Sequence, residues 1–579
     1  MNVRAFACMA MLAACGGQAP QGAENADLTF HQKPQITITS PAPGSFVAAS
    51  AEGMVDVAGT TRGAALTVNG AAAQVDAAGN FHARVQAQPG INLIDARASG
   101  LLGGDSQRAF IYGDFATLDQ QLAGGVMVRA NAAAFDDHSG DLDDFSAIAR
   151  AMLAQVDLMA LVKELPPYTY NFSGGSVDVA LTDVEFDKNA IALDLSPKAV
   201  GAHMSGSLAA VKISLAFTLH YDGDYTTTGT VSVDTVGFDG DLDLSYAGGA
   251  IAGSMGLPAI QLGKIGVTTD LDFPGIDDFL TFLANQFKGL IEQTLEQQIA
   301  GSAANHVAVT LNQIGLPPSL DLTPYGLPAT LLAAGSFDGA WFDGQGSTLS
   351  LAMNFASPSA VPQGAPGSLL LGGQAASSFP SSTFAASMSI DALNQATFAV
   401  WGQDGLVRQV YPAKSWGIFK LDAVVASPRL PPVITARSDG RLLVALGDIV
   451  VQSAVHTLFF DGPMEASISA TADIAADIDA ASGNLRFTLT GAPQISLDVT
   501  NLLGIVPDSL LAPLSAALQQ IAPSIVQKMV QPIEVPLPHL PLARLIPGST
   551  ATLGLAAPVN VTVDAVAQRV MLDGDLAQY

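Results

Sequence analysis

Cysteine is almost absent from this chain of 579 residues, and the two that occur, Cys8 and Cys15, both lie near the N-terminus. The rest of the chain therefore has no internal disulfide bonds and no thiol chemistry. A metal centre with cysteine ligands is excluded there. The eight histidines are scattered and no His-Glu-x-x-His motif occurs, so the sequence predicts no metal ligands.

Positive charge is also scarce. Lys and Arg number 24 against 52 Asp and Glu, which gives a formal net charge of −28. A nucleic-acid partner is excluded on this basis, because binding to phosphates requires a basic face. Simple electrostatic adhesion to anionic lipid headgroups is disfavoured for the same reason.

Long apolar runs are the third absence. After the first fifteen residues no run of 18 or more apolar residues occurs, so no membrane-spanning helix is predicted. Yet apolar residues make up 49% of the chain and charged residues only 13%. This apolar surplus must line an interior, and a cavity for apolar ligands is one economical way to place it.

The N-terminus has the pattern of a secretory signal. Met1–Arg4 carries a positive charge and Ala5–Ala14 is an apolar stretch too short to cross a bilayer. The sequence Leu12-Ala13-Ala14-Cys15 resembles the lipobox of bacterial lipoproteins. The alternative is an ordinary signal peptide that contains a cysteine.

The lipobox resemblance implies that residues 1–14 are removed and that Cys15 is lipidated, which anchors the protein to a membrane. Gly16 follows the cysteine, and the rule for bacterial lipoproteins then favours the outer membrane, with the protein facing the periplasm or the cell surface. Residues 15–33 are predicted to form a flexible tether.

Residues 34–113 are predicted to form a β-sandwich. Short alternating segments such as Ile36–Thr39, Leu66–Val68 and Asn80–Val85 are separated by Gly, Asn and Pro. The segment that begins with Val68-Asn69-Gly70 resembles bacterial Ig-like modules, which usually act as spacers or weak binding units.

Residues 114–355 are predicted to form a first lobe. An amphipathic helix begins at Phe145 after the acidic residues Asp141–Asp144, and strands follow from Tyr168 to about Val267. Turns are expected at Asp222–Asp224 and at Asp239-Gly240. A long helix is predicted over Ile276–Ile299, with its apolar residues on one face.

The same order of elements recurs after a predicted linker at residues 356–382, which is rich in Ser, Gly and Pro. Residues 383–579 are predicted to form a second lobe. Ser389–Trp401 begins it as a short helix or strand pair, strands follow, and a second long helix is expected over Asp508–Val530.

Two such lobes joined by a proline-rich linker resemble the BPI/LBP/CETP (TULIP) family of lipid-binding proteins. The resemblance covers residues 115–579 and depends on the order of several local features: Val177–Phe186, Gly206-Ser207-Leu208, Ile276–Ile299, Ser389–Ala396 and Ile533–Pro538. It implies an α+β fold in which twisted antiparallel sheets wrap long helices in an elongated boomerang, preceded here by the Ig-like unit.

The resemblance further implies one elongated apolar pocket per lobe, which holds the acyl chains of a phospholipid or another lipid. The candidate lipid-binding residues are apolar and lie on the predicted helices: in the first lobe Ile148, Met152, Val156, Leu280, Leu283, Phe287, Leu290 and Ile291, and in the second Leu393, Phe398, Leu514, Leu518, Ile521 and Ile525. The alternative for each residue is simple packing of helix on sheet.

This chain departs from the family pattern in two places. Family members that bind endotoxin carry a basic tip on the first lobe, whereas the hairpin His220–Asp224 is acidic here, which puts lipopolysaccharide neutralisation in doubt. The cysteine pair of vertebrate members is absent as well, without consequence for the predicted fold.

No catalytic or metal site is predicted. Asp136–Asp144 could hold a cation but lacks the EF-hand spacing, and a solvated loop before a helix explains it. Ser254 lies in a degenerate nucleophile-elbow pattern that falls between strands. Asp239, Asp241 and Asp243 are expected to face water.

The sequence therefore predicts a non-enzymatic, membrane-anchored lipid-binding or lipid-transfer lipoprotein without a cofactor. The alternative is a surface adhesion or scaffold lipoprotein in which the Ig-like unit is the binding module.

Overall fold

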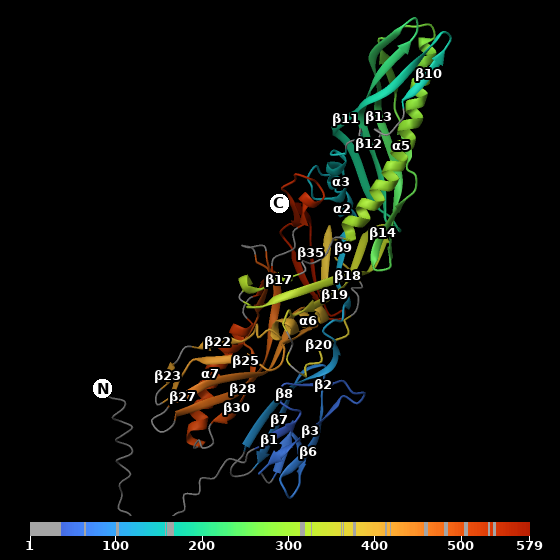
Figure 1. Cartoon of the computed structure of the whole chain (residues 1–579). Coiled ribbons are helices and arrows are strands. Elements are labelled where there is room, and N and C mark those ends of the chain that lie inside the picture. The colour runs from blue at the N-terminus through green and yellow to red at the C-terminus, as the bar shows by residue number, and fades with distance from the viewer. Residues whose placement is uncertain are drawn as a thin grey trace, which may run out of the picture.

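The computed structural model describes residues 36–579, except 63–64, 100–103, 157, 159–166, 313–318, 326, 360–361, 363, 374–377, 412–413, 417–418, 457–460, 480–483, 503–507, 531–532 and 536–539. The predicted signal peptide, Cys15 and the tether up to residue 33 lie outside the described residues. The molecule is elongated: one lobe forms one end, a central sheet lies in the middle, and the N-terminal unit and the second lobe lie side by side at the other end (Figure 1).

The N-terminal unit consists of β1 (Ile36–Ser40), β2 (Ser45–Ala48), β3 (Met54–Thr61), β4 (Ala65–Val68), β5 (Ala71–Val75), β6 (Asn80–Gln86), β7 (Gly90–Ser99) and β8 (Gly104–Ala116). They are joined in the order β1-β3-β6-β5-β4-β7-β8-β2. Both halves of this path contribute to one core, in which Val57, Phe81, Ile94 and Phe110 are fully buried. The predicted strands are confirmed, and β2 was missed; the Ig-like assignment stays a prediction.

This unit is packed against the rest of the molecule. Phe46 of β2 lies 5.7 Å from Phe115, 6.2 Å from Trp401 and 6.5 Å from Phe398, measured between ring centroids. The amide of Gln107 in β8 donates to Asp498 of the second lobe at 2.8 Å. Burial raises the pKa of this Asp498 carboxyl. The contacts fix the unit to both the central sheet and the second lobe.

The first lobe is a curled antiparallel sheet with one long helix. Its strands are β10 (Tyr168–Phe172), β11 (Gly175–Pro197), β12 (Ala202–His220), β13 (Asp224–Ala247) and β14 (Ala250–Met255), in that order, while β15 (Ala259–Leu262) and β16 (Ile265–Thr269) pair with β13. The helix α5 (Ile276–Asn312) is longer than predicted. At its end the Asn312 side chain bonds both the amide and the carbonyl of Ile251, each at 2.8 Å, which holds the helix on β14.

The turn predicted at Asp239-Gly240 is wrong. Both residues lie inside β13 and pair with Ser205 and Met204 of β12. A Cβ on Gly240 would lie 2.7 Å from the side chain of Met255. The glycine lies in a closely packed part of the sheet and does not mark a turn.

Two short helices, α2 (Ala132–Phe135) and α3 (Phe145–Leu153), connect the central sheet to the first lobe. As predicted, an acidic residue precedes α3: Asp144 is its N-cap and accepts the Ala147 amide at 2.5 Å. Burial is the main reason that the pKa of Asp144 is raised to about 6.

The central sheet combines distant parts of the chain. Its order is β17 (Ser319–Asp321), β18 (Thr330–Asp343), β19 (Gly346–Ala356), β9 (Leu122–Asn131), β21 (Phe384–Ser389), β35 (Arg569–Gly574) and β34 (Asn560–Asp564). Helix α6 (Ile390–Trp401) packs on it and is capped by Ser389, which accepts the Ala392 amide. Within the predicted linker, β20 (Ser368–Leu370) pairs with β8.

The second lobe repeats the scheme of a sheet with a long helix. Its sheet contains β22 (Arg408–Tyr411), β23 (Lys414–Trp416), β24 (Phe419–Leu421), β25 (Val424–Pro428), β26 (Val433–Ala436), β27 (Leu442–His456), β28 (Asp461–Ile478), β29 (Leu485–Leu489), β30 (Gln494–Leu502) and β31 (Ile533–Val535). The predicted helix is confirmed as α7 (Asp508–Met529). A small sheet of β32 (Leu540–Pro541), β33 (Thr552–Leu555) and β36 (Leu576–Gln578) lies near the C-terminus. The fold is thus mainly β, with a few long helices.

Candidate functional site

The long strands of the first lobe present one apolar face. In β12 the residues Met204, Leu208, Val211, Ile213, Leu215, Phe217 and Leu219 are buried, and the residues between them are more exposed. At Ala210, whose φ is 53°, the alternation changes phase: the register with β13 is the same on both sides, and the buried positions are even-numbered before residue 210 and odd-numbered after it. At about 3.3 Å per residue the 19 residues of β12 span roughly 60 Å.

The first half of helix α5 covers the tip half of this face, and the helix then continues to β14 at the other end of the lobe. Phe279, Leu283, Phe287 and Ile291 are each at most 7% exposed and pack against β11, β12 and β13. Aromatic rings surround Phe279: its centroid lies 5.3 Å from Tyr170, 5.6 Å from Phe273 and 5.8 Å from Phe217. This part of the lobe is a solid core.

The apolar face continues toward the base of the lobe, meaning the end where Pro197 pairs with Ala202 and Leu242 pairs with Met255. Here the buried residues Leu193, Met204 and Phe238 form a second cluster. The residues packed on this cluster remain partly exposed: Ala149 and Leu153 of α3, together with Leu195, Met255 and Ile260. We call this cluster and its partly exposed neighbours the base groove, a name that stands for these residues and not for a measured cavity.

The predicted lipid-binding residues of the first lobe are distributed over two places. Leu283, Phe287, Leu290 and Ile291 pack together in the core under α5, which is the alternative of helix packing on sheet, and their lipid-binding role stays a prediction. Leu280 and Val156 are half-buried.

Ile148 and Met152 differ from the expectation, because they pack with Leu542, Ile546 and Leu553 of the C-terminal segment. Helix α3 has two apolar faces. Residues 148 and 152 lie on one, while residues 149 and 153 lie on the other and face the sheet.

In the second lobe Leu518, Ile521 and Ile525 are at most 2% exposed and pack on β27 and β28. Leu393 of α6 packs at the margin of the same core. Phe398 differs from the expectation: it lies in the central core beside Phe46 and Trp401, because α6 covers the central sheet. The side chain of Leu514 lies outside the described residues.

Sequence reasoning missed the base groove. Leu193, Met204 and Phe238 alternate with polar residues in long strands, and that pattern signals one buried face without saying what covers it. Ala149 gave only a weak signal, because a small residue on a helix contributes little to an apolar stripe. The available clue was a second pair of apolar residues at helical spacing, Ala149 and Leu153.

The opposite, outer face of the sheet is polar. Asp239, Asp241 and Asp243 are exposed, as predicted, and His203 lies between two of them, 2.8 Å from Asp241 and 3.3 Å from Asp239. A shallow depression of about 380 Å³ on the lobe is lined mainly by hydroxyls, including Thr182, Thr230 and Thr268. Ser254 lies within β14 opposite Asp243 and not at a turn from strand to helix.

Each lobe carries a histidine between two carboxylates at one end of a long strand pair, β12 with β13 in the first lobe and β27 with β28 in the second. His220 lies 2.7 Å from Asp224 and 3.2 Å from Asp178. His456 lies 3.0 Å from both Asp422 and Asp461. These hydrogen bonds raise the pKa of both histidines. Their contribution to stability is therefore complete below the ordinary histidine pKa and is lost as the pH rises through the raised value.

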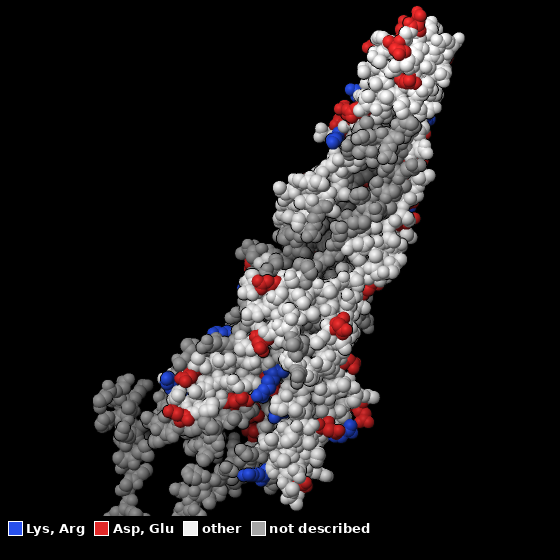
Figure 2. All heavy atoms as spheres, viewed as in Figure 1, with Lys and Arg blue, Asp and Glu red and all other residues white. Residues whose placement is uncertain are grey.

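Few charged side chains lie on the face of the molecule shown in Figure 2, and acidic ones outnumber basic ones there. Wide uncharged areas separate them. Within the described part of the chain, no helix is both long and apolar enough to cross a membrane.

No protein-family model matches the chain, and no curated protein matches its sequence. Among solved structures, lipopolysaccharide binding protein aligns with a TM-score of 0.39 at 14% identity, over 78% of this chain and 98% of that one. P47 of Clostridium botulinum E1 gives 0.28 at 7% identity, over 79% and 100%. P47 from Clostridium botulinum A2 gives 0.29 at 9% identity, over 78% and 97%. Scores below 0.5 do not establish a shared fold.

Proposed function

We propose that this protein binds the acyl chains of a lipid in the base groove of the first lobe. The observation that carries the proposal is the unequal filling of one continuous apolar face. The tip half is sealed by α5, with Phe279 and Leu283 at most 1% exposed. At the base the buried cluster is small, formed by Leu193, Met204 and Phe238, and its neighbours Leu195, Met255 and Ile260 stay partly exposed, although Ile260 also touches the margin of the tip core.

Acyl chains match this surface physically. Each CH₂ group moved from water onto apolar side chains contributes about 0.8 kcal/mol, and no specific polar chemistry is required. Polar groups of the sheet lie on the outer face, where Asp239, Asp241 and Asp243 are exposed. The groove therefore favours hydrocarbon over charged or strongly polar ligands.

Exposed apolar residues occur at the same end of the sheet. Val200, in the turn between β11 and β12, is 53% exposed, and Leu257, just after β14, is 71% exposed. The register that pairs Ala202 with Leu242, and Leu242 with Met255, places both turns at the base. Such side chains suit the entrance through which an acyl chain leaves a membrane or micelle.

Charge substitution in the groove tests the proposal. Ile260→Glu puts a carboxylate on the partly buried face, and we expect the Kd for a fluorescent fatty-acyl probe to rise at least about tenfold, since burying a charge opposes binding. Gln261→Glu is the matched control, because this neighbouring residue is exposed on the other face of β15.

A second pair of variants changes size and leaves charge unaltered. Ala149→Trp should fill the groove and weaken probe binding to a similar extent, whereas Ala216→Trp on the outer face of β12 should leave it unchanged. If wild type, Ile260→Glu and Ala149→Trp bind the probe equally well, the base groove is not the binding site and the proposal is wrong.

We also propose that Cys15 anchors the protein to the outer membrane. The support is the sequence Leu12-Ala13-Ala14-Cys15 after a short apolar stretch. Cys15→Ala should move the protein from the membrane fraction to the soluble fraction of the expressing bacterium. Retention of the Cys15→Ala variant in washed membranes would contradict the anchor, without bearing on the groove.

A further inference from the structure

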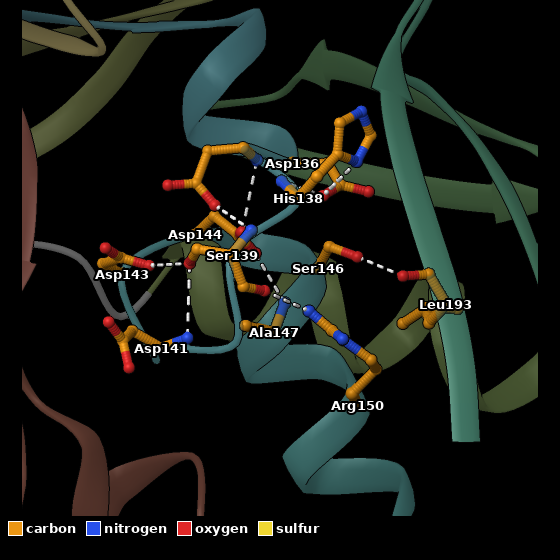
Figure 3. A network of polar contacts seen from close by, with 11 residues as sticks. Asp136, His138, Ser139, Asp141, Asp143, Asp144, Ser146, Ala147, Arg150 and Leu193 are labelled. Atoms are coloured by element: carbon orange, nitrogen blue, oxygen red, sulfur yellow. Dashed lines mark hydrogen bonds and ion pairs between the residues drawn. The ribbon is translucent and has the colours of Figure 1, made fainter. Parts of the chain in front are cut away.

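The loop between α2 and α3 concentrates negative charge beside the first-lobe sheet. Five of the nine residues from Asp136 to Asp144 are aspartates. Figure 3 shows Asp136, Asp141, Asp143 and Asp144 around this loop, with Arg150 reaching it from α3. Arg150 donates to the Ser139 carbonyl at 3.1 Å, so its guanidinium is directed at the backbone. The charge of the loop is therefore largely uncompensated.

Three of the groups around the loop converge at one point. One carboxylate oxygen each from Asp136 and Asp194 and one ring nitrogen of His138 all lie within 4.8 Å of one another. Asp194 belongs to β11, and Ser146 of α3 hydrogen-bonds the carbonyl of the adjacent Leu193. The contact between Ser146 and β11 thus brings together residues 136, 138 and 194, which are distant in the sequence.

Asp136 is the residue that points to a ligand. Its side chain is only 6% exposed, in a loop where the His138 side chain is 81% exposed. Its Oδ1 accepts the His138 amide at 2.9 Å and lies 3.1 Å from Nδ1 of the His138 ring, whereas its Oδ2 is buried without a hydrogen-bond partner. A buried carboxylate oxygen without a partner is costly, and a bound cation removes that cost.

We propose that Asp136, His138 and Asp194 bind a divalent transition-metal cation of the Zn²⁺ or Mn²⁺ type. Two carboxylates and one imidazole are ligands that both ions accept, whereas Ca²⁺ and Mg²⁺ prefer oxygen ligands alone. With bonds of about 2.1 Å and tetrahedral angles, two ligand atoms on one ion lie about 3.4 Å apart. The exposed side chains of His138 and Asp194 therefore have to move toward the fixed Asp136 by up to about 1.4 Å, which their side-chain rotations allow.

A bound metal ion would link three parts of the molecule to one another. The loop leads out of α2 beside the central sheet, Asp194 belongs to the first-lobe sheet, and the Leu142 amide donates to Gln578 near the C-terminus at 3.1 Å. Asp194 lies between the groove residues Leu193 and Leu195, but its exposed side chain is on the opposite face of β11, so loss of metal binding and loss of lipid binding are distinguishable.

Titration calorimetry on the full chain, stripped with chelator and then dialysed, tests the site with ZnCl₂, MnCl₂ and CaCl₂ in separate runs. We expect one equivalent of Zn²⁺ or Mn²⁺ per chain and a rise in Tm on binding. Asp136→Asn and Asp194→Asn should each weaken binding at least tenfold. Asp141→Asn is the matched control, an exposed aspartate of the same loop outside the ligand set, and should stay within about threefold of wild type.

Asp194→Asn keeps the test decisive if Asp136→Asn fails to fold, because residue 194 is exposed on its strand. Two results would overturn the proposal. One is the absence of Zn²⁺ and Mn²⁺ binding to the wild type. The other is binding that survives Asp194→Asn but is lost in Asp143→Asn, which would assign the ion to the neighbouring group of Asp137, Asp143 and Asp144.

Discussion

Replacement of Arg569 by Met should lower the free energy of unfolding by about 3–5 kcal/mol, because it removes a buried charge on which several strands depend. Arg569 is 1% exposed in β35. Its Nε donates to the Ser387 hydroxyl of β21 at 3.0 Å, and its Nη2 donates to the Gly124 carbonyl of β9 at 2.8 Å. One side chain therefore bridges three strands of the central sheet.

Electrostatics supports this expectation. Burial lowers the pKa of Arg569 to about 10, while the charge of Asp338 acts in the opposite direction. Asp338 accepts the Gly124 amide at 2.6 Å, so Gly124 connects it to Arg569. Removal of the guanidinium leaves the Gly124 carbonyl without this donor and Asp338 without its nearby cation.

Urea denaturation of the full chain measures the effect, and Arg441→Met is the matched control. Arg441 also pairs with carboxylates, at 2.6 Å from Asp439, but its side chain is 41% exposed. An exposed ion pair contributes less than about 1 kcal/mol. If both variants unfold at the same denaturant concentration, Arg569 does not stabilise the central sheet as described.

Phe279→Ala should destabilise the first lobe by about 3–5 kcal/mol, the loss typical of a fully buried aromatic residue. Phe279 is 0% exposed, and three rings surround it: Tyr170, Phe217 and Phe273. Removing its ring opens a cavity at the point where α5 begins on the sheet.

The matched control is Tyr225→Ala, an aromatic residue of the same lobe that is 53% exposed and should change stability by less than about 0.5 kcal/mol. Unfolding of both variants is followed by far-ultraviolet circular dichroism, which measures loss of secondary structure and does not depend on tryptophan. A Phe279→Ala variant as stable as Tyr225→Ala would mean that the tip half is not the solid core described above.

Local periodicity predicted most of the elements. The apolar spacing of the segment from residue 276 identified α5, the acidic cluster before residue 145 indicated the start of α3, and the helix over residues 508–529 is confirmed. These features depend on neighbours within a few residues, which a sequence displays directly.

Pairing between distant segments could not be predicted in this way. In the central sheet β9 pairs with β19 and β21, and β21 pairs with β35, so its strands come from residues 122 to 574. Each is a short alternating segment that would suit many partners. For the same reason Phe398 was assigned to the second-lobe pocket, although α6 follows β21 onto the central sheet.

The site was predicted in part. The face of α5 that includes Leu283, Phe287 and Ile291 does pack on the first-lobe sheet. The choice of Ile148 and Met152 followed the larger side chains of α3, yet its smaller face, with Ala149, lies on the sheet. Which face of a two-sided helix meets a sheet depends on the other element available, here the C-terminal segment.

The most direct test of the lipid-binding claim is native mass spectrometry of the full-length protein, purified without detergent and incubated with phospholipid vesicles. The Cys15→Ala variant is used, so that a covalent anchor adds no mass. We predict peaks heavier than the bare chain by the mass of at least one phospholipid, at reduced occupancy in Ile260→Glu and unchanged occupancy in Gln261→Glu. A spectrum that contains only the bare chain in all three proteins would contradict the account.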